Sequence, residues 1–228
     1  MGRSKKTYIF SLIVLLCASC AYGAITWNII DDSCDDISGW IDNDVAGGVS
    51  IENPAGQFEF DSGTTAGANA ARGKLLGAVV PDSYTLEVRV IINACTDYNT
   101  DGSYFAVQFY DSGFLINTLW DSTHMYFFSS ALGAVNEVGT NVSDIGVWHT
   151  WRIVVKSTKG AANATANVYK DGVLIAAGVD CAQTGTWTEG KLDIATHTGT
   201  DALATIAHID FIRISSQSYP ASQIRVTK

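Results

Sequence analysis

Apolar and polar residues alternate with a period of two along much of this chain, and this alternation limits the folds that it can adopt. In residues 84–93 every second residue is apolar, and Glu87 and Arg89 lie between the apolar positions. Residues 103–110 and 148–156 alternate in the same way. Successive side chains of a strand point to opposite faces, so each segment predicts a strand with one buried face. Glu87 and Arg89 are interpreted as a solvated or salt-bridged pair on the outer face.

Turn signals separate the alternating segments. Asp171-Gly172 lies between apolar residues and predicts a two-residue hairpin, because glycine tolerates the positive φ that such turns require. The stretch 63–73, rich in Ala, Gly and Thr, is expected to be a loop or an irregular edge. About ten strands with connections rich in Gly, Asn and Asp predict an all-β fold, a two-sheet antiparallel β-sandwich. The further strands are expected near residues 25–30, 49–52, 57–60, 114–120, 124–128, 190–196 and 205–214.

The first residues have the pattern of a secretory signal peptide. Three basic residues lie within the first six, an apolar run follows at 8–17, and small residues Ala21 and Gly23 precede a cleavage site. The apolar run is shorter than the ~20 residues that span a bilayer. We therefore expect a signal peptide over residues 1–23, one sandwich domain over 24–228, and a secreted or periplasmic location. The alternative is a lipoprotein anchored through Cys20.

The charge of the chain excludes some partners. Removing the leader takes three of the 14 basic residues and none of the 23 acidic ones, which leaves a net charge of −12. Such a field repels nucleic acid. No second apolar stretch is long enough to span a membrane. Three cysteines remain, Cys34, Cys95 and Cys181, and their number does not reveal which two would pair in an oxidising compartment.

Short segments in order along the chain resemble one superfamily. They are Trp148-His149-Thr150-Trp151, Tyr169-Lys170-Asp171-Gly172, the closing segment 208–214 and the opening segment 31–40. These segments resemble the concanavalin A-like lectin/glucanase superfamily, which includes laminin G-like domains and the jelly rolls of glycoside hydrolase family 16. The resemblance covers most of the mature chain. It implies a concanavalin A-like jelly roll in which a concave sheet binds glycans.

The catalytic pattern of the family 16 enzymes is missing from the sequence. Those enzymes carry Glu-x-Asp-x-x-Glu on one strand, and this chain contains no such run. Retaining glycosidases need two carboxylates about 5–5.5 Å apart. The first hypothesis is therefore an exported, lectin-like protein that binds a poly- or oligosaccharide. A divergent glycoside hydrolase or polysaccharide lyase is the second hypothesis, and an extracellular structural or adhesion protein with protein partners at a cell surface is the third.

Six residues are predicted to contact the glycan, because sugar rings stack on aromatic side chains and sugar hydroxyls bond to amides. Three of them share the polar face of one alternating segment. Two others extend that face if their strands lie alongside, and the last stands in a polar loop. Strand tyrosines are also common through β-propensity alone, which is the competing explanation. The predicted residues are Tyr104, Gln108, Tyr110, Trp120, Tyr126 and Trp187.

Two sets of residues predict a structural calcium ion. Asp97, Asn99 and Asp101 have the spacing of the first half of an oxygen-ligand loop. A turn that uses Asp and Asn for backbone reasons explains the same letters. The resemblance to family 16 jelly rolls implies a second calcium on the convex side, with Asp210 of the closing strand as a ligand. Asp32, near the first strand, is the candidate for a second ligand.

Overall fold

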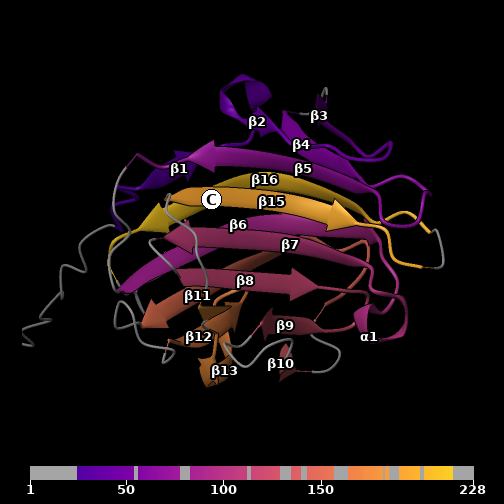
Figure 1. The fold of residues 1–228 in the computed structure, drawn as a ribbon. Coiled ribbons are helices and arrows are strands. Elements are labelled where there is room, and N and C mark those ends of the chain that lie inside the picture. The colour runs from indigo at the N-terminus through magenta and orange to yellow at the C-terminus, as the bar shows by residue number, and fades with distance from the viewer. Residues whose placement is uncertain are drawn as a thin grey trace, which may run out of the picture.

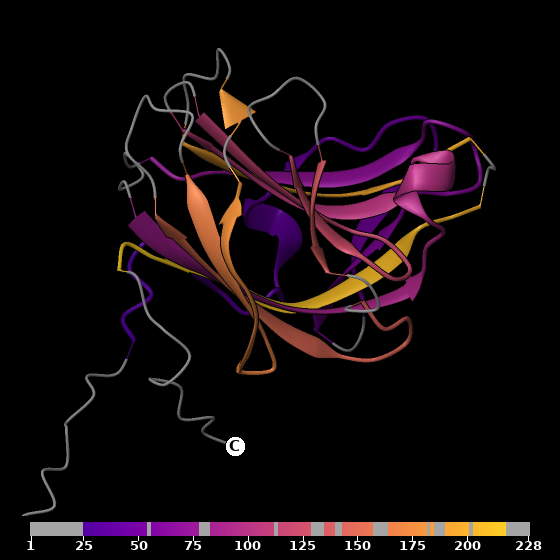
Figure 2. The same cartoon turned by 90° about the horizontal axis from the view of Figure 1, so that it is seen from below.

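The structure, a computed structural model, describes residues 25–53, 56–77, 83–111, 114–128, 135–139, 143–156, 164–181, 183–184, 190–200 and 203–217. These residues form two antiparallel sheets of eight strands each, which pack face to face (Figure 1). Figure 2 shows the two layers from below. The predicted two-sheet antiparallel β-sandwich is therefore confirmed. Within the described ranges, no helix has the length and apolar character that a membrane crossing requires.

Each sheet has seven strands in one continuous order and an eighth strand that pairs outside that order. Sheet A runs β13 (Val173–Asp180), β12 (Thr165–Lys170), β11 (His149–Lys156), β6 (Ser83–Ala94), β16 (Ile206–Ser215), β4 (Gln57–Asp61), β3 (Val49–Asn53), and β1 (Ile30–Asp32) pairs with β16. Sheet B runs β10 (Val135–Gly139), β9 (Met125–Phe128), β8 (Phe114–Trp120), β7 (Tyr104–Asp111), β15 (Lys191–His197), β5 (Asn69–Leu75), β2 (Ile41–Asp42), and β14 (Gln183–Thr184) pairs with β8. Two short helices, η1 (Ile37–Gly39) and α1 (Tyr98–Asp101), lie in connections.

The clearest sequence signals appear as the predicted elements. The three alternating segments form β6, β7 and β11 within one residue of their expected bounds. Asp171 and Gly172 join β12 to β13 with φ values of 50° and 83°. A two-residue hairpin of type I′ needs positive φ at both positions, and glycine supplies the second without strain.

Four of the described strands were not predicted from the sequence, namely β2, β5, β10 and β14, and β5 is the longest of them. The stretch expected to be a loop or irregular edge contains the start of β5, which lies inside sheet B between β15 and β2. Ala70 fills its core-facing position and is fully buried. Small residues give little periodic hydrophobic signal, yet they let a strand pack closely against its neighbours.

The core between the sheets is built by the inward faces of both. The rings of Trp120 on sheet B and Trp151 on sheet A meet edge to face with centroids 5.7 Å apart. Phe105 packs on Trp120 at 5.4 Å. Trp40 and Phe58 make a second edge-to-face contact at 5.4 Å. Edge-to-face pairs of this kind add to the free energy that comes from burying apolar area.

Two of the four segments that carried the resemblance contact each other. The His149 Nδ1 atom lies 2.6 Å from Asp171 Oδ2, and the Thr150 backbone N–H donates to Asp171 Oδ1 at 2.9 Å. The Asp171 backbone N–H in turn donates to the Thr150 carbonyl at 2.8 Å. The hairpin turn is thereby fastened to the start of β11, so these residues have a structural role.

The charged residues of β6 pair differently from the expectation. Glu87 is buried on the outer face of sheet A, where Arg152 of the neighbouring β11 donates to it from Nε at 2.8 Å and from the terminal nitrogen at 2.5 Å. Arg89 pairs instead with Asp210 of β16 at 2.5 Å and lies over the Trp148 ring. Residues two apart on a strand are about 6.8 Å apart, whereas cross-strand neighbours lie about 5 Å apart.

Cys34, Cys95 and Cys181, the three cysteines of the described ranges, form no disulfide bond with one another. Cys34 and Cys181 are fully buried, and burial raises the pKa of both thiols well above the ordinary value. A thiol is reactive only as its thiolate, so these two side chains behave as small apolar residues of the core.

Candidate functional site

The outer face of sheet B carries four of the six side chains that the sequence predicted for ligand binding. On β7, Phe105, Val107 and Phe109 enter the core, and the alternate residues Tyr104 and Gln108 point outward and are partly exposed. Tyr110, two residues after Gln108, lies on the same outer side of β7 and is also partly exposed. The strand alternation that predicted this face is therefore present in the structure.

Register places polar residues from three strands in one row across this face. Gln108 of β7 lies opposite Asp193 of β15 on one side and opposite Asn117 of β8 on the other. Because neighbouring strands are about 4.8 Å apart, the row spans roughly 10 Å. Asp193 Oδ1 and Asn117 Oδ1 are buried and have no hydrogen-bond donor among the described residues. We call Asp193, Gln108 and Asn117 the polar row.

An ion pair and a phenol border the polar row. The Lys191 Nζ atom lies 2.9 Å from Asp193 Oδ2 and 5.9 Å from the centre of the Tyr110 ring. The Tyr110 hydroxyl donates to Gln108 Oε1 at 2.6 Å. Burial raises the pKa of the Asp193 carboxyl, and the nearby Lys191 ammonium opposes that rise. Burial and the Asp193 carboxylate raise the pKa of Tyr110, so its phenol stays protonated and remains a donor.

Gly73 leaves the space that the Asp193–Lys191 pair occupies. Gly73 belongs to β5 and lies opposite Asp193 of the neighbouring β15. A Cβ atom there would stand 2.5 Å from Asp193 Oδ1, 2.8 Å from Lys191 Cε and 2.9 Å from Asn43 Nδ2. Glycine at this position therefore sets the positions of both charged side chains.

Aromatic rings gather at the other end of the same face. Tyr104 stacks on His197 with centroids 5.0 Å apart, and Tyr98 of α1 meets Tyr104 at 5.8 Å and Tyr126 at 5.7 Å. Burial lowers the pKa of His197, and its Nδ1 lies 2.8 Å from Asn69 Oδ1. Tyr104 and His197 are partly exposed, so an apolar sugar face has a neutral aromatic surface to stack on.

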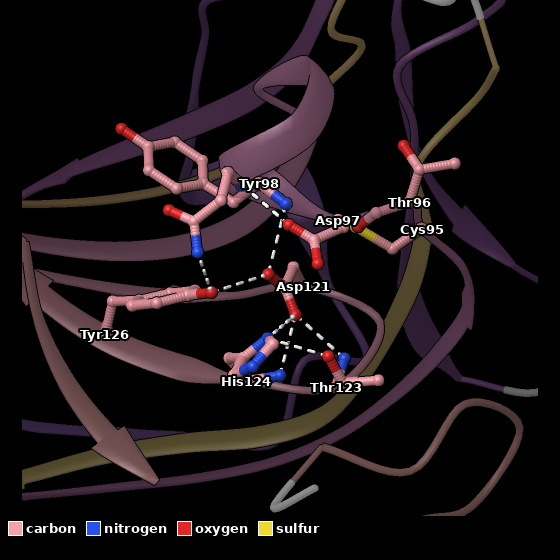
Figure 3. A network of polar contacts seen from close by, with 9 residues as sticks. Cys95, Thr96, Asp97, Tyr98, Asp121, Thr123, His124 and Tyr126 are labelled. Atoms are coloured by element: carbon pink, nitrogen blue, oxygen red, sulfur yellow. Dashed lines mark hydrogen bonds and ion pairs between the residues drawn. The ribbon is translucent and has the colours of Figure 1, made fainter. Parts of the chain in front are cut away.

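The α1 end also holds a group with metal-ligand chemistry. The buried Asp121, Asp97 and His124 each place one ligand-type atom within 4.8 Å of the others (Figure 3). The Asp121 carboxylate is already hydrogen-bonded at 2.6–3.1 Å to four donors, which are the backbone N–H groups of Tyr98, Thr123 and His124 and the hydroxyl of Tyr126. The His124 Nδ1 atom also lies 3.4 Å from Asp121 Oδ1. The four donors satisfy the hydrogen-bonding capacity of this buried carboxylate.

The remaining predicted ligand residues fall in different places. Trp120 is fully buried and faces the core, so it leaves the predicted set. Tyr126 lies on the outer side of sheet B but is 2% exposed, with its hydroxyl bonded to Asp121. Trp187 lies outside the described residues. Asp193, Asn117, Lys191 and His197 were not predicted from the sequence. The alternation that begins at residue 190 and extends to His197 would have indicated Lys191, Asp193 and His197.

The three residues of the first predicted calcium set, Asp97, Asn99 and Asp101, each form hydrogen bonds with other residues of the protein. Asp97 caps α1 by accepting from the Asn99 backbone N–H at 2.8 Å, and the Asn99 amide donates to Tyr126. Asp101 accepts from Thr96 and Ser103.

The second predicted calcium set is neutralised by basic side chains. Asp32 Oδ2 lies 2.5 Å from Lys74 Nζ, and Asp210 is held by Arg89. A calcium ion at these two carboxylates would have to compete with both cations.

Comparison with known proteins shows the fold of this chain through solved structures. No protein-family model matches the sequence, and no curated protein matches it. Among solved structures, the cellulose-induced protein Cip1 aligns with a TM-score of 0.61 and 12% identity over 84% of this chain and 99% of that one. A structure described with endo-acting O-glycanases of the human gut microbiota aligns at 0.57, with 14% identity over 86% of this chain and 100% of that one.

A toxin domain shares the same architecture. A structure described with botulinum neurotoxin type C and two ganglioside molecules aligns with a TM-score of 0.56 and 10% identity, over 85% of this chain and 49% of that one. These neighbours share the β-sandwich fold of this chain.

Proposed function

We propose that this chain is an exported carbohydrate-binding protein that holds a poly- or oligosaccharide on the outer face of sheet B. One observation carries the proposal: a stacked Tyr104–His197 pair and the polar row occupy the same face. They are four residues apart along the strands, or roughly 13 Å. Sugars present apolar C–H faces and hydroxyls together, so one face that carries both rings and amides suits an oligosaccharide.

The solved structures that share the fold support this proposal. One of them is described with gangliosides and another with the breakdown of mucin. Because one sandwich architecture hosts several functions, the site must carry the argument. The superfamily membership and the signal peptide over residues 1–23 belong to the same proposal. Amino-terminal sequencing of the exported protein is expected to begin at Ala24.

The charges of the face favour binding over hydrolysis. Of the described side chains on the outer face of β5, β7, β8 and β15, Asp193 supplies the single carboxylate. Retaining hydrolysis needs two, about 5–5.5 Å apart. One observation supports the alternative of a divergent hydrolase or lyase: burial raises the pKa of Asp193, as in a general acid.

A panel of immobilised polysaccharides tests the proposal. Retention and the release of new reducing or unsaturated ends are measured for the wild type, for Tyr104→Ala and for Gln108→Ala. We expect retention without products, and a loss of retention in both variants. The control is Glu52→Ala, an exposed residue of β3 on sheet A. Products that disappear in Asp193→Asn would favour the enzyme, and no retention on any polysaccharide would refute carbohydrate binding.

A structural calcium ion remains a separate proposal. Asp97 belongs to the predicted loop and also to the group with Asp121 and His124, which makes it the residue to vary. Asp97→Asn keeps a side chain that caps α1 but removes the charge. A thermal midpoint that rises with calcium in the wild type and less in Asp97→Asn would support a site there. Equal midpoints with calcium and with a chelator would exclude it.

A further inference from the structure

The outer face of sheet B has one basic side chain among its described strand residues, and that side chain is already paired. Lys191 is 27% exposed and lies 2.9 Å from Asp193, which is 14% exposed. The two other basic residues on this part of the sheet, Arg72 and Lys74, face the sandwich interior. Arg72 donates to Ser50 of sheet A, and Lys74 pairs with Asp32 and lies over the Trp40 ring.

The other charges near this face are negative. Asp97 and Asp121 lie at the α1 end, and Glu137 of β10 lies opposite Tyr126 of β9. The polar row adds two buried acceptor oxygens that have no donor among the described residues, Asp193 Oδ1 and Asn117 Oδ1. A ligand carboxylate would therefore enter a region of negative potential with a neutralised lysine. A hydroxyl group carries no such penalty, because it donates as readily as it accepts.

We propose that Asp193, by holding Lys191 in an ion pair, makes this face selective for uncharged glycans over glycans that carry uronic acids. The inference depends on the proposed carbohydrate binding and names the class of sugar that the site takes. Asp193 acts through Lys191, as a specificity residue. Like-charge contacts and unpaired charges against the wrong ligand are a common source of discrimination.

The test uses two ligands that differ at one carbon. Oligosaccharides of β-1,4-linked glucose are compared with the same oligosaccharides oxidised at C6 to glucuronic acid, by calorimetry or by affinity electrophoresis at pH 7.5. If this backbone is not retained, the neutral polymer that the panel identifies and its oxidised form replace it. The wild type is expected to bind the neutral ligand at least about tenfold more tightly, the size of one uncompensated charge contact of about 1.4 kcal/mol.

Two variants of the ion pair shift the preference in opposite directions. Asp193→Asn leaves the lysine charge unpaired, so the ratio of neutral to uronate affinity should fall about fivefold, with a stronger salt dependence for the uronate. Lys191→Gln leaves Asp193 unpaired, so that ratio should rise. General damage to the site would not move the ratio in opposite directions. Asp36→Asn, at the exposed cap of η1, is the matched control, and thermal melts verify folding.

The outcomes separate the two proposals. A wild type that prefers the uronate, or variants that shift the ratio in the same direction, would overturn the selectivity and leave carbohydrate binding intact. A wild type that binds neither ligand class on the full panel would overturn carbohydrate binding, and the selectivity with it.

Discussion

Replacing Gly73 with alanine tests whether the face around Asp193 binds a ligand, because this change reaches the site without disturbing the fold. Gly73 has no positive φ, so alanine suits its backbone. The added Cβ would lie 2.5 Å from Asp193 Oδ1 and 2.8 Å from Lys191 Cε, where ordinary contacts are 3.4–4 Å. Both atoms belong to side chains that can rotate away, which displaces the ion pair by about 1 Å.

The expected cost falls on binding. Displacing one charge-assisted contact by that amount should weaken glycan affinity about tenfold, or about 1.4 kcal/mol. The free energy of unfolding should change by less than about 1 kcal/mol, because alanine also reduces the entropy of the unfolded chain. Affinity is measured on the best polysaccharide of the panel, and stability by urea denaturation.

Two other glycines calibrate the result. A Cβ at Gly39 meets nothing within 4 Å, so Gly39→Ala should change neither quantity. A Cβ at Gly48 would lie 2.0 Å from the Asn69 carbonyl oxygen, so Gly48→Ala should be strongly destabilising. Wild-type affinity in a folded Gly73→Ala protein would refute the assignment of this face, and a loss of stability like that of Gly48→Ala would refute the reasoning on side-chain displacement.

Three further predictions concern stability. Trp120→Ala should lower the free energy of unfolding by about 3–5 kcal/mol in urea denaturation, since it empties a core position against Phe105 and Trp151; a small loss with weaker glycan binding would return Trp120 to the ligand set. His149→Ala should cost about 1 kcal/mol by the same assay, because it removes the contact with Asp171 that holds the β12–β13 turn; an unchanged midpoint would contradict that role. Burial lowers the pKa of His197 below its ordinary value of 6.5, so below that pH the unfolded chain takes up a proton that the folded chain resists, and stability falls. Urea midpoints at pH 7 and pH 5 should differ less in His197→Gln than in the wild type, and an equal difference would contradict the prediction.

Local patterns in the sequence were sufficient for the strands with one apolar face. The alternation in residues 84–93 and 103–110 specifies β6 and β7, because the side-chain period of a strand is a property of its own backbone. The Asp171-Gly172 turn is equally local, since it depends on the φ values that two residues can adopt. The all-β fold, the hairpin and the face of Tyr104 and Gln108 therefore followed from the sequence.

Other strands carried no such pattern. Residues 114–120 are apolar almost throughout, so alternation does not say which side faces the core. Pairing decides it: Trp120 lies opposite the core residue Phe105, and Leu119 lies opposite Ala106 on the outer side. β5 was missed because alanine and glycine contribute little to a hydrophobic period, although their small size is what its neighbours need.

The sequence by itself determined that this chain forms strands, where one turn lies and which side of β7 is polar. Only the tertiary structure decided that Asp193, Gln108 and Asn117 form one row, that Lys191 is neutralised beside it, and that Glu87 belongs with Arg152. The physical reason is register. A strand's own residues fix the alternation of its faces, but which residues meet across strands depends on how the strands align, and a shift of one residue would replace every one of these neighbours.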